Sequence, residues 1–258
     1  MTDPGGRPVV EAVDVTRSYR MADVEVTALA GVSLRIDAGE YLAVLGPSGS
    51  GKSTLMHLLG LLDRPTSGTL RIDGREVAGR SDAELAELRN ATIGFVFQSF
   101  QLLSRTSAVD NVALPLVYRG VRGRERRERA VAALQAVGLG HRLGHRPTQL
   151  SGGEQQRIAV ARALVGGPRV LLADEPTGNL DSRTGAEVMA LVEQLNADRG
   201  VAVVLVTHDE TVASRARRRI VMRDGRVVED SAAGDGTVGD SAAGDSAVGD
   251  SAVGDSAS

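Results

Sequence analysis

The chain has 258 residues, 42% of them apolar, which is enough for one domain or two modest ones. It contains no cysteine, so a disulfide framework and a thiolate metal site are excluded. Six aspartates follow Glu229. Without them 30 basic residues stand against 27 acidic ones, and this body charge of about +3 is too mild to indicate nucleic-acid binding.

Hydrophobic patterning predicts strands that alternate with helices. Two strands with one solvated face are expected at 9–15 and 32–36, as an amino-terminal antiparallel element. An apolar run at 41–45 leads into a glycine-rich loop, and helical spacing follows over 52–62. Buried parallel strands separated by helices would give an α/β fold with a parallel-sheet core. Three further apolar runs are expected to be buried strands: 93–97, 170–173 and 201–207.

Helical patterns dominate between 97 and 168, and include 124–137 and 153–165. We expect these residues, roughly 98–167, to form a helical lobe inserted into one domain that covers 1–229. No apolar run approaches the roughly 20 residues of a membrane helix, and the amino terminus lacks the apolar region of a signal peptide. A cytoplasmic chain is therefore expected.

The carboxyl-terminal residues, 230–258, form an acidic tail built on a five-residue repeat that begins SAAGD, GTVGD, SAAGD. Glycine, serine, alanine and aspartate without aromatic residues cannot bury enough surface to fold. The tail is expected to be disordered. A repeat expansion with no specific role and a partner-binding segment are both open interpretations.

Of the 30 basic residues, 29 are arginine, and the single lysine, Lys52, lies in the segment GPSGSGKS from Gly46 to Ser53. This segment matches G-x-x-x-x-G-K-[ST], with an expected strand before it and a helix after it. Its backbone N–H groups can point at phosphates, and an ammonium reaches between phosphate oxygens where a planar guanidinium is too wide. We expect Lys52 to neutralise the β and γ phosphates of a nucleoside triphosphate and Ser53 to ligate Mg²⁺.

Two carboxylates follow the apolar run at 170–173. Asp174 suits the Mg²⁺ shell, and Glu175 could polarise an attacking water. Buried strands often end in acidic residues, so the pair alone is a weak signal. Beside a phosphate loop it becomes a strong one.

A third segment, LSGGEQQR at 150–157, opens a helix with Ser151, Gly152 and Gly153, whose first N–H groups make an anion site. A chain with two such helix starts about a hundred residues apart resembles the ABC-type ATPase subunits of membrane transporters, for which LSGGQ-like segments are the signature. The resemblance covers roughly 9–229. It implies a P-loop NTPase that binds ATP and Mg²⁺, in which the signature of one chain caps the ATP of a second copy.

The resemblance also assigns roles to residues that are unremarkable alone. Tyr19 matches the aromatic residue that stacks on adenine, and Gln98 matches the glutamine that senses Mg²⁺ and the γ-phosphate. Asp181 belongs to a loop at the dimer interface, and His208 matches the histidine of the γ-phosphate. The whole set implied for ATP and Mg²⁺ is Tyr19, Gly46, Pro47, Ser48, Gly49, Ser50, Gly51, Lys52, Ser53, Thr54, Gln98, Ser151, Gly152, Gly153, Glu154, Asp174, Glu175, Asp181 and His208.

One residue departs from the family pattern, because Glu154 stands where many members have glutamine. Its side chain points away from the phosphates in that pattern, so activity should be retained. Two other groups are given no role in the reaction. His141 and His145 lack a third metal ligand nearby, and the arginine-rich stretch 122–129 also contains glutamates and is typical of a solvated helical face.

The resemblance implies a separate transmembrane permease, with the ATPase peripheral to the cytoplasmic face of the membrane. Phe100, Leu102 and Leu103 lie where the family docks its permease, although they could equally pack inside. The residues in and around the motifs are most similar to those of the macrolide-exporter, lipoprotein-releasing and cell-division branch of the family. The implied function is export or mechanical coupling of a lipoprotein, macrolide, peptide or similar cargo.

Two alternatives stay open. One is a cell-division ATPase that regulates a cell-wall hydrolase through its membrane partner. The other is a non-transport ABC ATPase of DNA repair, chromosome structure or translation. Those proteins carry a coiled-coil or zinc insertion or a second ATPase domain, and none is evident in this sequence.

Overall fold

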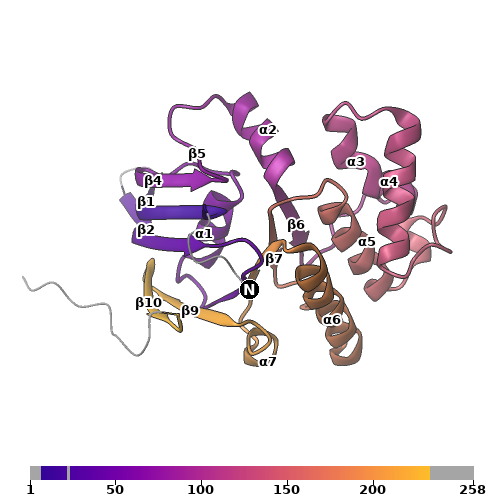
Figure 1. The fold of residues 1–258 in the computed structure, drawn as a ribbon. Helices are drawn as coiled ribbons and strands as arrows, with labels where there is room; N and C mark the ends of the chain where they lie inside the picture. Colours follow the sequence, from indigo (N-terminus) through magenta and orange to yellow (C-terminus); the bar gives the residue numbers. More distant parts are fainter. Residues whose placement is uncertain (1–6, 22–23, 233–258) are drawn as a thin grey trace, which may run out of the picture.

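The computed structural model describes residues 7–21 and 24–232, so most of the acidic tail, 233–258, lies outside the described residues. An antiparallel sheet stands at one side, in the order β2-β1-β4-β5 (Figure 1). Its strands are β1 (Val10–Met21), β2 (Val24–Ile36), β4 (Ser67–Ile72) and β5 (Arg75–Glu76).

A second, six-stranded sheet runs through the centre in the order β10-β9-β3-β8-β7-β6. Neighbouring strands from β9 to β6 pair in parallel, and β10 pairs antiparallel with β9. The six strands are β3 (Tyr41–Leu45), β6 (Ile93–Phe97), β7 (Val170–Asp174), β8 (Ala202–Val206), β9 (Arg218–Arg223) and β10 (Arg226–Asp230).

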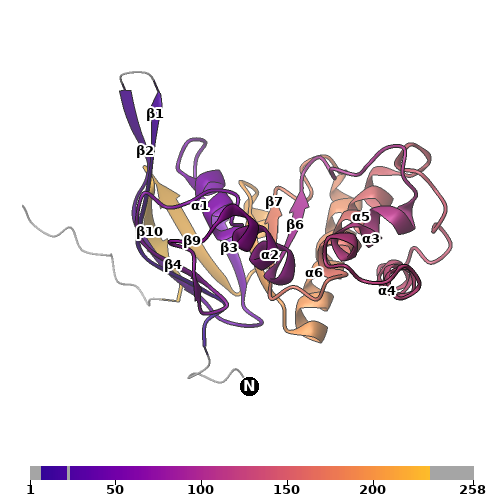
Figure 2. The same cartoon turned by 90° about the horizontal axis from the view of Figure 1, so that it is seen from above.

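The central sheet is buried on both faces, as parallel sheets usually are. In β8, Ala202, Val204 and Val206 face a core shared with the antiparallel sheet and α1, whereas Val203 and Leu205 face a second core shared with the helical lobe. Figure 2 shows the sheet between these two layers. The helices are α1 (Lys52–Leu59), α2 (Asp82–Thr92), α3 (Ala108–Tyr118), α4 (Gly123–Ala136), α5 (Gly152–Leu164), α6 (Ser182–Arg199) and α7 (Glu210–Ala213), with a 3₁₀ turn at Pro147–Gln149.

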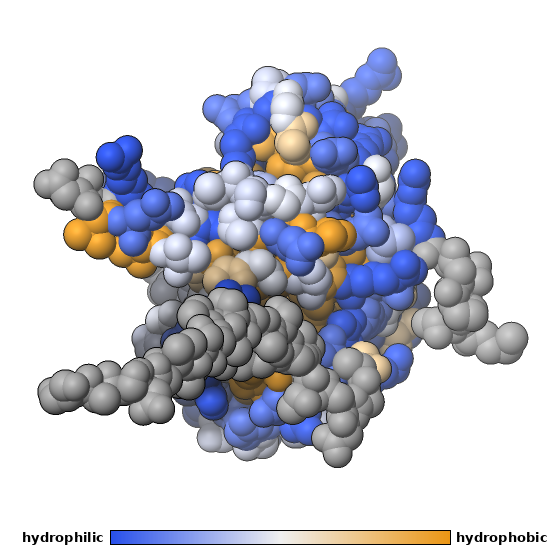
Figure 3. Space-filling model, turned by 90° about the vertical axis from the view of Figure 1, so that its left-hand side faces the viewer, coloured by the Kyte–Doolittle hydropathy of each residue, from blue (hydrophilic) through white to orange (hydrophobic). Residues whose placement is uncertain are grey.

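The first two strands are much longer than the predicted segments 9–15 and 32–36, and they project as a hairpin (Figure 2). Their apolar alternation is interrupted by register shifts, one of them at Asp14, where φ is +48° and the backbone N–H donates to Ser33 Oγ at 3.0 Å. Apolar side chains remain exposed on this hairpin, including Val24 and Val26. Figure 3 shows the face from this side as a mixture of hydrophilic and hydrophobic areas.

The folded part extends past the predicted boundary between 229 and 230. Asp230 ends β10, where its carboxylate forms an ion pair of 2.5 Å with Arg218. Ser231 N then donates to Arg219 O at 2.9 Å. The composition of the repeat does not reveal these contacts, because they depend on the pairing of β10 with the preceding strand, β9. Within the described ranges no helix combines the length and apolar character needed to cross a bilayer.

Candidate active site

Four adjacent parallel strands end at one edge of the central sheet, and a predicted site residue follows each of them. In sheet order from β3 to β6 these are the loop from Gly46, then His208, then Asp174 with Glu175, then Gln98. Ligands of open α/β sheets bind beyond the carboxyl ends of the strands. The fold therefore gathers in one row residues that are up to 162 positions apart in the sequence, as between Gly46 and His208.

The phosphate loop can only be built from glycine at two of its positions. A Cβ on Gly46, where φ is +148°, would lie 2.3 Å from Met222 O, and one on Gly51, where φ is +100°, would lie 2.6 Å from Ala28 O. Lys52 Nζ turns back over the loop and donates to Gly46 O at 2.7 Å and to Pro47 O at 2.8 Å. The backbone thus forms a cradle with one ammonium at its mouth.

The remaining loop residues leave polar groups available for a ligand. Pro47, Ser48 and Gly49 are exposed, and Thr54 lies in the first turn of α1. The buried hydroxyl of Ser50 has no hydrogen-bond partner among the described residues. A buried, unpaired hydroxyl inside a phosphate loop fits a site that is completed by a ligand.

The residues predicted to hold Mg²⁺ offer oxygen donors of the kind that this ion prefers: the hydroxyl of Ser53, the carboxylate of Asp174 and the amide of Gln98. Burial raises the pKa of Asp174, as does nearby Glu175, while His57 and Lys52 oppose the shift. The described part of the chain contains no group of three or more His, Cys, Asp or Glu side chains placed to hold a metal ion. Mg²⁺ needs no such cluster, since it binds through one or two protein groups and substrate phosphates, so these residues fit it.

Glu175 and His208 meet directly. Glu175 Oε1 lies 2.6 Å from His208 Nδ1 and accepts from His208 N at 3.0 Å, and Oε2 accepts from Thr207 Oγ1 at 3.2 Å. The Glu175 backbone has φ of +43°, a conformation uncommon outside glycine, and its N–H donates to Val206 O at 2.9 Å. Both ends of the residue are therefore fixed by β8 and the turn after it.

Gln98 and the loop before α6 are also joined. Gln98 Nε2 donates to Asn179 Oδ1 at 3.3 Å, and Asn179 Nδ2 donates to Gln98 O at 3.1 Å. Two residues farther on, Asp181 caps α6 by accepting from Thr184 N at 3.0 Å. Asp181 is exposed, so its carboxylate faces outward beside the edge that carries Gln98.

Tyr19 lies on β1 and is held by two residues that sequence patterns did not reveal. Its hydroxyl donates to Asp63 Oδ2 at 2.8 Å, and the guanidinium of Arg17 lies 4.5 Å from the ring centroid. Asp63 also pairs with Arg17 at 2.8 Å. One ring face is thereby covered and the hydroxyl is occupied, so what Tyr19 can offer a ligand is its remaining face.

Comparison with known proteins decides the family. The family model described as ABC transporter matches residues 29–178. The chain belongs to this family. The α/β fold and the ABC ATPase identity indicated by the motifs are confirmed.

Three relatives of this ABC ATPase are informative. An uncharacterized ABC transporter ATP-binding protein of Thermotoga maritima is 52% identical over 86% of this chain and 94% of its own length. The macrolide export ATP-binding/permease protein MacB of Azoarcus sp. is 53% identical over 87% of this chain, which spans only 34% of that relative. A dimeric structure of a post-hydrolysis state of the ATP-binding cassette MJ0796, bound to ADP and Pi, has a TM-score of 0.78, 44% identity, and coverage of 86% of this chain and 97% of its own.

The signature segment of this ABC ATPase lies outside the row formed at the strand ends. Ser151 caps α5, which packs against α3, α4, α6 and β6 in the helical lobe, whereas the phosphate loop begins α1 on the other face of the sheet (Figure 1). Gly152 and Gly153 form the first turn, and a Cβ on Gly153 would lie 2.3 Å from Thr184 Cγ2. Within one chain, α1 and α5 therefore pack into different cores on opposite faces of the central sheet.

Glu154, whose side chain the family pattern directs away from the phosphates, folds back onto the capping residue of its own helix. Its Oε2 accepts from Ser151 N at 2.9 Å while its own N–H donates to Ser151 Oγ at 3.2 Å, a reciprocal cap that turns the carboxylate toward the helix start. Arg142 Nε donates to its other oxygen at 3.0 Å. The arginine-rich stretch on α4 is exposed and forms ion pairs within the helix, such as Arg124 with Glu128 at 2.9 Å, as expected of a solvated face.

Proposed function

We propose that this ABC ATPase works as a pair of identical chains that hydrolyse ATP with Mg²⁺ and drive a separate membrane permease from the cytoplasmic face of the membrane. The observation that carries the proposal is the separation of the two anion-binding helix starts. One chain offers Lys52 and its loop at one place and Ser151 at another, so a complete ATP site needs both surfaces brought together from two chains. The dimeric form of the MJ0796 cassette supports this arrangement.

Within each composite site the residues would divide the work by their chemistry. The loop 46–54 would bind the phosphates, and the free face of Tyr19 would stack on adenine. Ser53, Asp174 and Gln98 would hold Mg²⁺, which supplies neutralisation of phosphate charge. Glu175 would orient and deprotonate the attacking water, and His208 would contact the γ-phosphate. Ser151 of the other chain would donate its hydroxyl hydrogen to a phosphate oxygen, because an ionised phosphate oxygen can only accept and the bond from Glu154 N leaves that hydrogen unused.

Dilution tests the pairing. If two chains build each site, doubling the chain concentration in the dilute range should raise the total rate of ATP hydrolysis about fourfold, by mass action. The measurement is phosphate release at saturating ATP over a dilution series, with oligomeric state followed in parallel by light scattering. A rate that stays proportional to concentration while light scattering shows only single chains would contradict a composite site.

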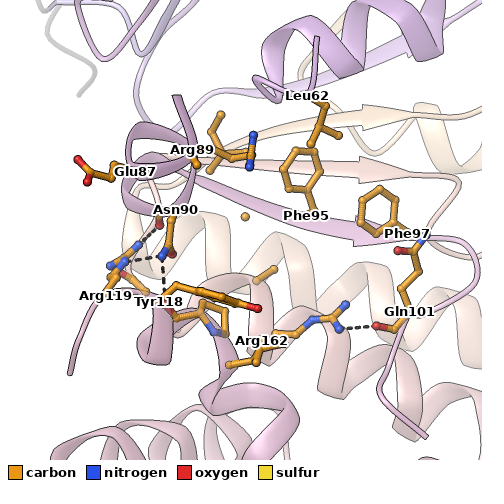
Figure 4. A pocket seen from close by; sticks show the side chains of 17 residues that line it. Leu62, Glu87, Arg89, Asn90, Phe95, Phe97, Gln101, Tyr118, Arg119 and Arg162 are labelled. Atoms are coloured by element: carbon orange, nitrogen blue, oxygen red, sulfur yellow. Dashed lines mark hydrogen bonds between the residues drawn. The ribbon is translucent and has the colours of Figure 1, made fainter. Parts of the chain in front are cut away.

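A surface cavity of about 660 Å³ supports the proposal that the chain binds a membrane protein. It lies between α2, β6, α3 and α5, with Phe95 and Phe97 stacked at 5.4 Å on one wall (Figure 4). Two large side chains at its rim are exposed, Leu62 at 49% and Tyr118 at 77%. Leu103 is also exposed at 49%, whereas Leu102 packs into the core of the helical lobe, so the apolar residues after Gln98 divide between surface and interior.

The charge of this cavity indicates what kind of segment fits it. Three arginines line it, Arg89, Arg119 and Arg162, together with one glutamate, Glu87. The arginines form no ion pair with the described residues and donate instead to carbonyl groups such as Phe100 O, 3.0 Å from Arg162 Nη2. Burial lowers the pKa of Arg162 and of Arg119. A cytoplasmic segment of the permease that combines apolar side chains with a carboxylate would satisfy both the apolar walls and these guanidinium groups.

Photocrosslinking tests this surface. A benzophenone side chain placed at Tyr118, in cells that naturally make the protein, should yield a covalent adduct with an integral membrane protein. The same probe at Arg124, which is 93% exposed on α4 away from the cavity, should yield none. Adducts with ribosomal proteins or DNA-bound proteins at position 118 would favour the non-transport alternatives instead.

The cargo is proposed from similarity alone. The Azoarcus relative is named for macrolide export, and a relative in Pseudomonas entomophila, 52% identical over 88% of this chain, is named for pyoverdine export. We therefore favour a transporter that exports, or does mechanical work on, a macrolide, lipoprotein, peptide or similar cargo. A cell-division ATPase acting on a cell-wall hydrolase through its membrane partner is the second candidate, because the motifs resemble both groups.

A further inference from the structure

The start of α5 carries a carboxylate where many members of the family have an amide. Hydrogen bonding from Ser151 N, followed by contact with Arg142, lowers the pKa of Glu154, so the group is ionised at neutral pH. A carboxylate at the amino end of a helix meets the same partial positive charges that would attract a phosphate. Taken alone, Glu154 would therefore weaken the attraction of this helix end for the ATP bound to another chain.

Capping does not require that charge, and the chain itself shows why. At the 3₁₀ turn just before the signature, Gln149 Oε1 accepts from Arg146 N at 2.8 Å, an amide version of the bond that Glu154 makes to Ser151 N. Glutamine serves as well as glutamate in such caps. The negative charge of Glu154 thus needs a separate explanation from the cap.

The positive charge of Arg142 lies next to the carboxylate of Glu154, on a loop that is held in place by separate contacts. Its Nε donates to Glu154 Oε1 at 3.0 Å, and its Nη1 lies 3.2 Å from His145 Nε2. Arginine has only donors, so Arg142 is the donor in a hydrogen bond between these two atoms. The loop is fixed to the first turn of α3, where Ala108 N donates to His145 O at 2.8 Å. The guanidinium is therefore held beside Glu154.

We propose that Arg142 is a charge-compensating residue of the composite ATP site. It cancels the carboxylate of Glu154, so that the signature end of α5 keeps its attraction for the phosphates of ATP bound to the second chain. This rests on the proposed function, since it requires that α5 meet the ATP of another chain. In this proposal the net charge of Arg142 and Glu154, rather than the geometry of their contact, determines how strongly the start of α5 attracts phosphate.

Four proteins test the proposal, and all of them carry Glu175→Gln to slow ATP turnover. The first, the reference, has no other change. The other three add Arg142→Gln, Glu154→Gln or both substitutions. The measurement is the ATP concentration at half-maximal dimerisation, by light scattering at low salt. Arg142→Gln should raise it about fivefold, Glu154→Gln should lower it about fivefold, and the double variant should return to within about twofold of the reference. At about 1 M salt these differences should largely disappear.

A matched control is Arg215→Gln, which removes an ion pair of 2.9 Å with Glu193 at similar exposure on another part of the surface, and it should not shift the midpoint. A purely structural tether predicts a different pattern, in which both single variants raise the midpoint and the double variant is no better than either. That result, or a double variant that stays as weak as Arg142→Gln, overturns charge compensation. Absence of any ATP-driven dimer in the reference would overturn the two-chain function as well, and this separates the two failures.

Discussion

Glu175→Gln is expected to lower the kcat for ATP hydrolysis by a factor of about 10² to 10³, while ATP binding is retained. Glutamine keeps the shape of the side chain: its carbonyl oxygen can still accept from the N–H of His208, as Glu175 Oε1 does at 3.0 Å, and its NH₂ group can donate to Thr207 Oγ1, which lies 3.2 Å from Glu175 Oε2. It cannot take a proton from water. The effect should therefore fall on the chemical step and leave the nucleotide bound.

The measurement is kcat for phosphate release together with ATP affinity from a fluorescent analogue. Glu128→Gln, an equivalent change on the exposed face of α4, serves as the control and should leave both values unchanged. ATP should also hold the Glu175→Gln chains together as dimers, because slow hydrolysis would delay their separation. A kcat within about threefold of the unchanged protein would remove Glu175 from the role of base.

Local sequence predicted those parts of the fold that depend on local features. Strands β3 and β6 begin and end at the predicted residues, since a strand buried on both faces is apolar throughout and is bounded by polar groups. The helix after the phosphate loop was predicted to reach 62 but ends at Leu59, where Gly60 follows and Leu61 adopts a φ of +54°. That turn is set by packing rather than by helical spacing.

The motif residues were located by spacing, but the residues that support them were not. Asp63 lies 44 positions from Tyr19 and Arg142 lies 12 from Glu154, and in neither pair do the two residues share a helix or a strand. Asn111 is a similar case, since it is fully buried and its side chain bonds the loop at Leu103 from within α3. Such partners are chosen by the tertiary fold, so only a structure could reveal them.

The second large expected effect is a loss of ATP affinity when Lys52, the single lysine, is replaced. Lys52→Arg is expected to weaken ATP binding by a factor of about 10 to 100, the loss that corresponds to one or two charge-assisted hydrogen bonds. The Nζ atom fits within 2.7 Å of Gly46 O and 2.8 Å of Pro47 O, and the loop has no space even for a Cβ at Gly46. A guanidinium keeps the charge but brings a planar fork of three nitrogens into that space.

Two companion variants separate shape from charge. Lys52→Met removes the charge while filling similar volume, and Arg127→Lys makes the reverse exchange on the exposed face of α4, where it should have no effect. If the compact shape of the ammonium matters, the Lys52→Arg and Lys52→Met variants should bind a fluorescent ATP analogue with affinities within about threefold of each other, both far below the unchanged protein. If charge alone matters, the arginine variant should bind nearly as well as the unchanged protein. In that case the single lysine among 30 basic residues would have no structural reason to be there.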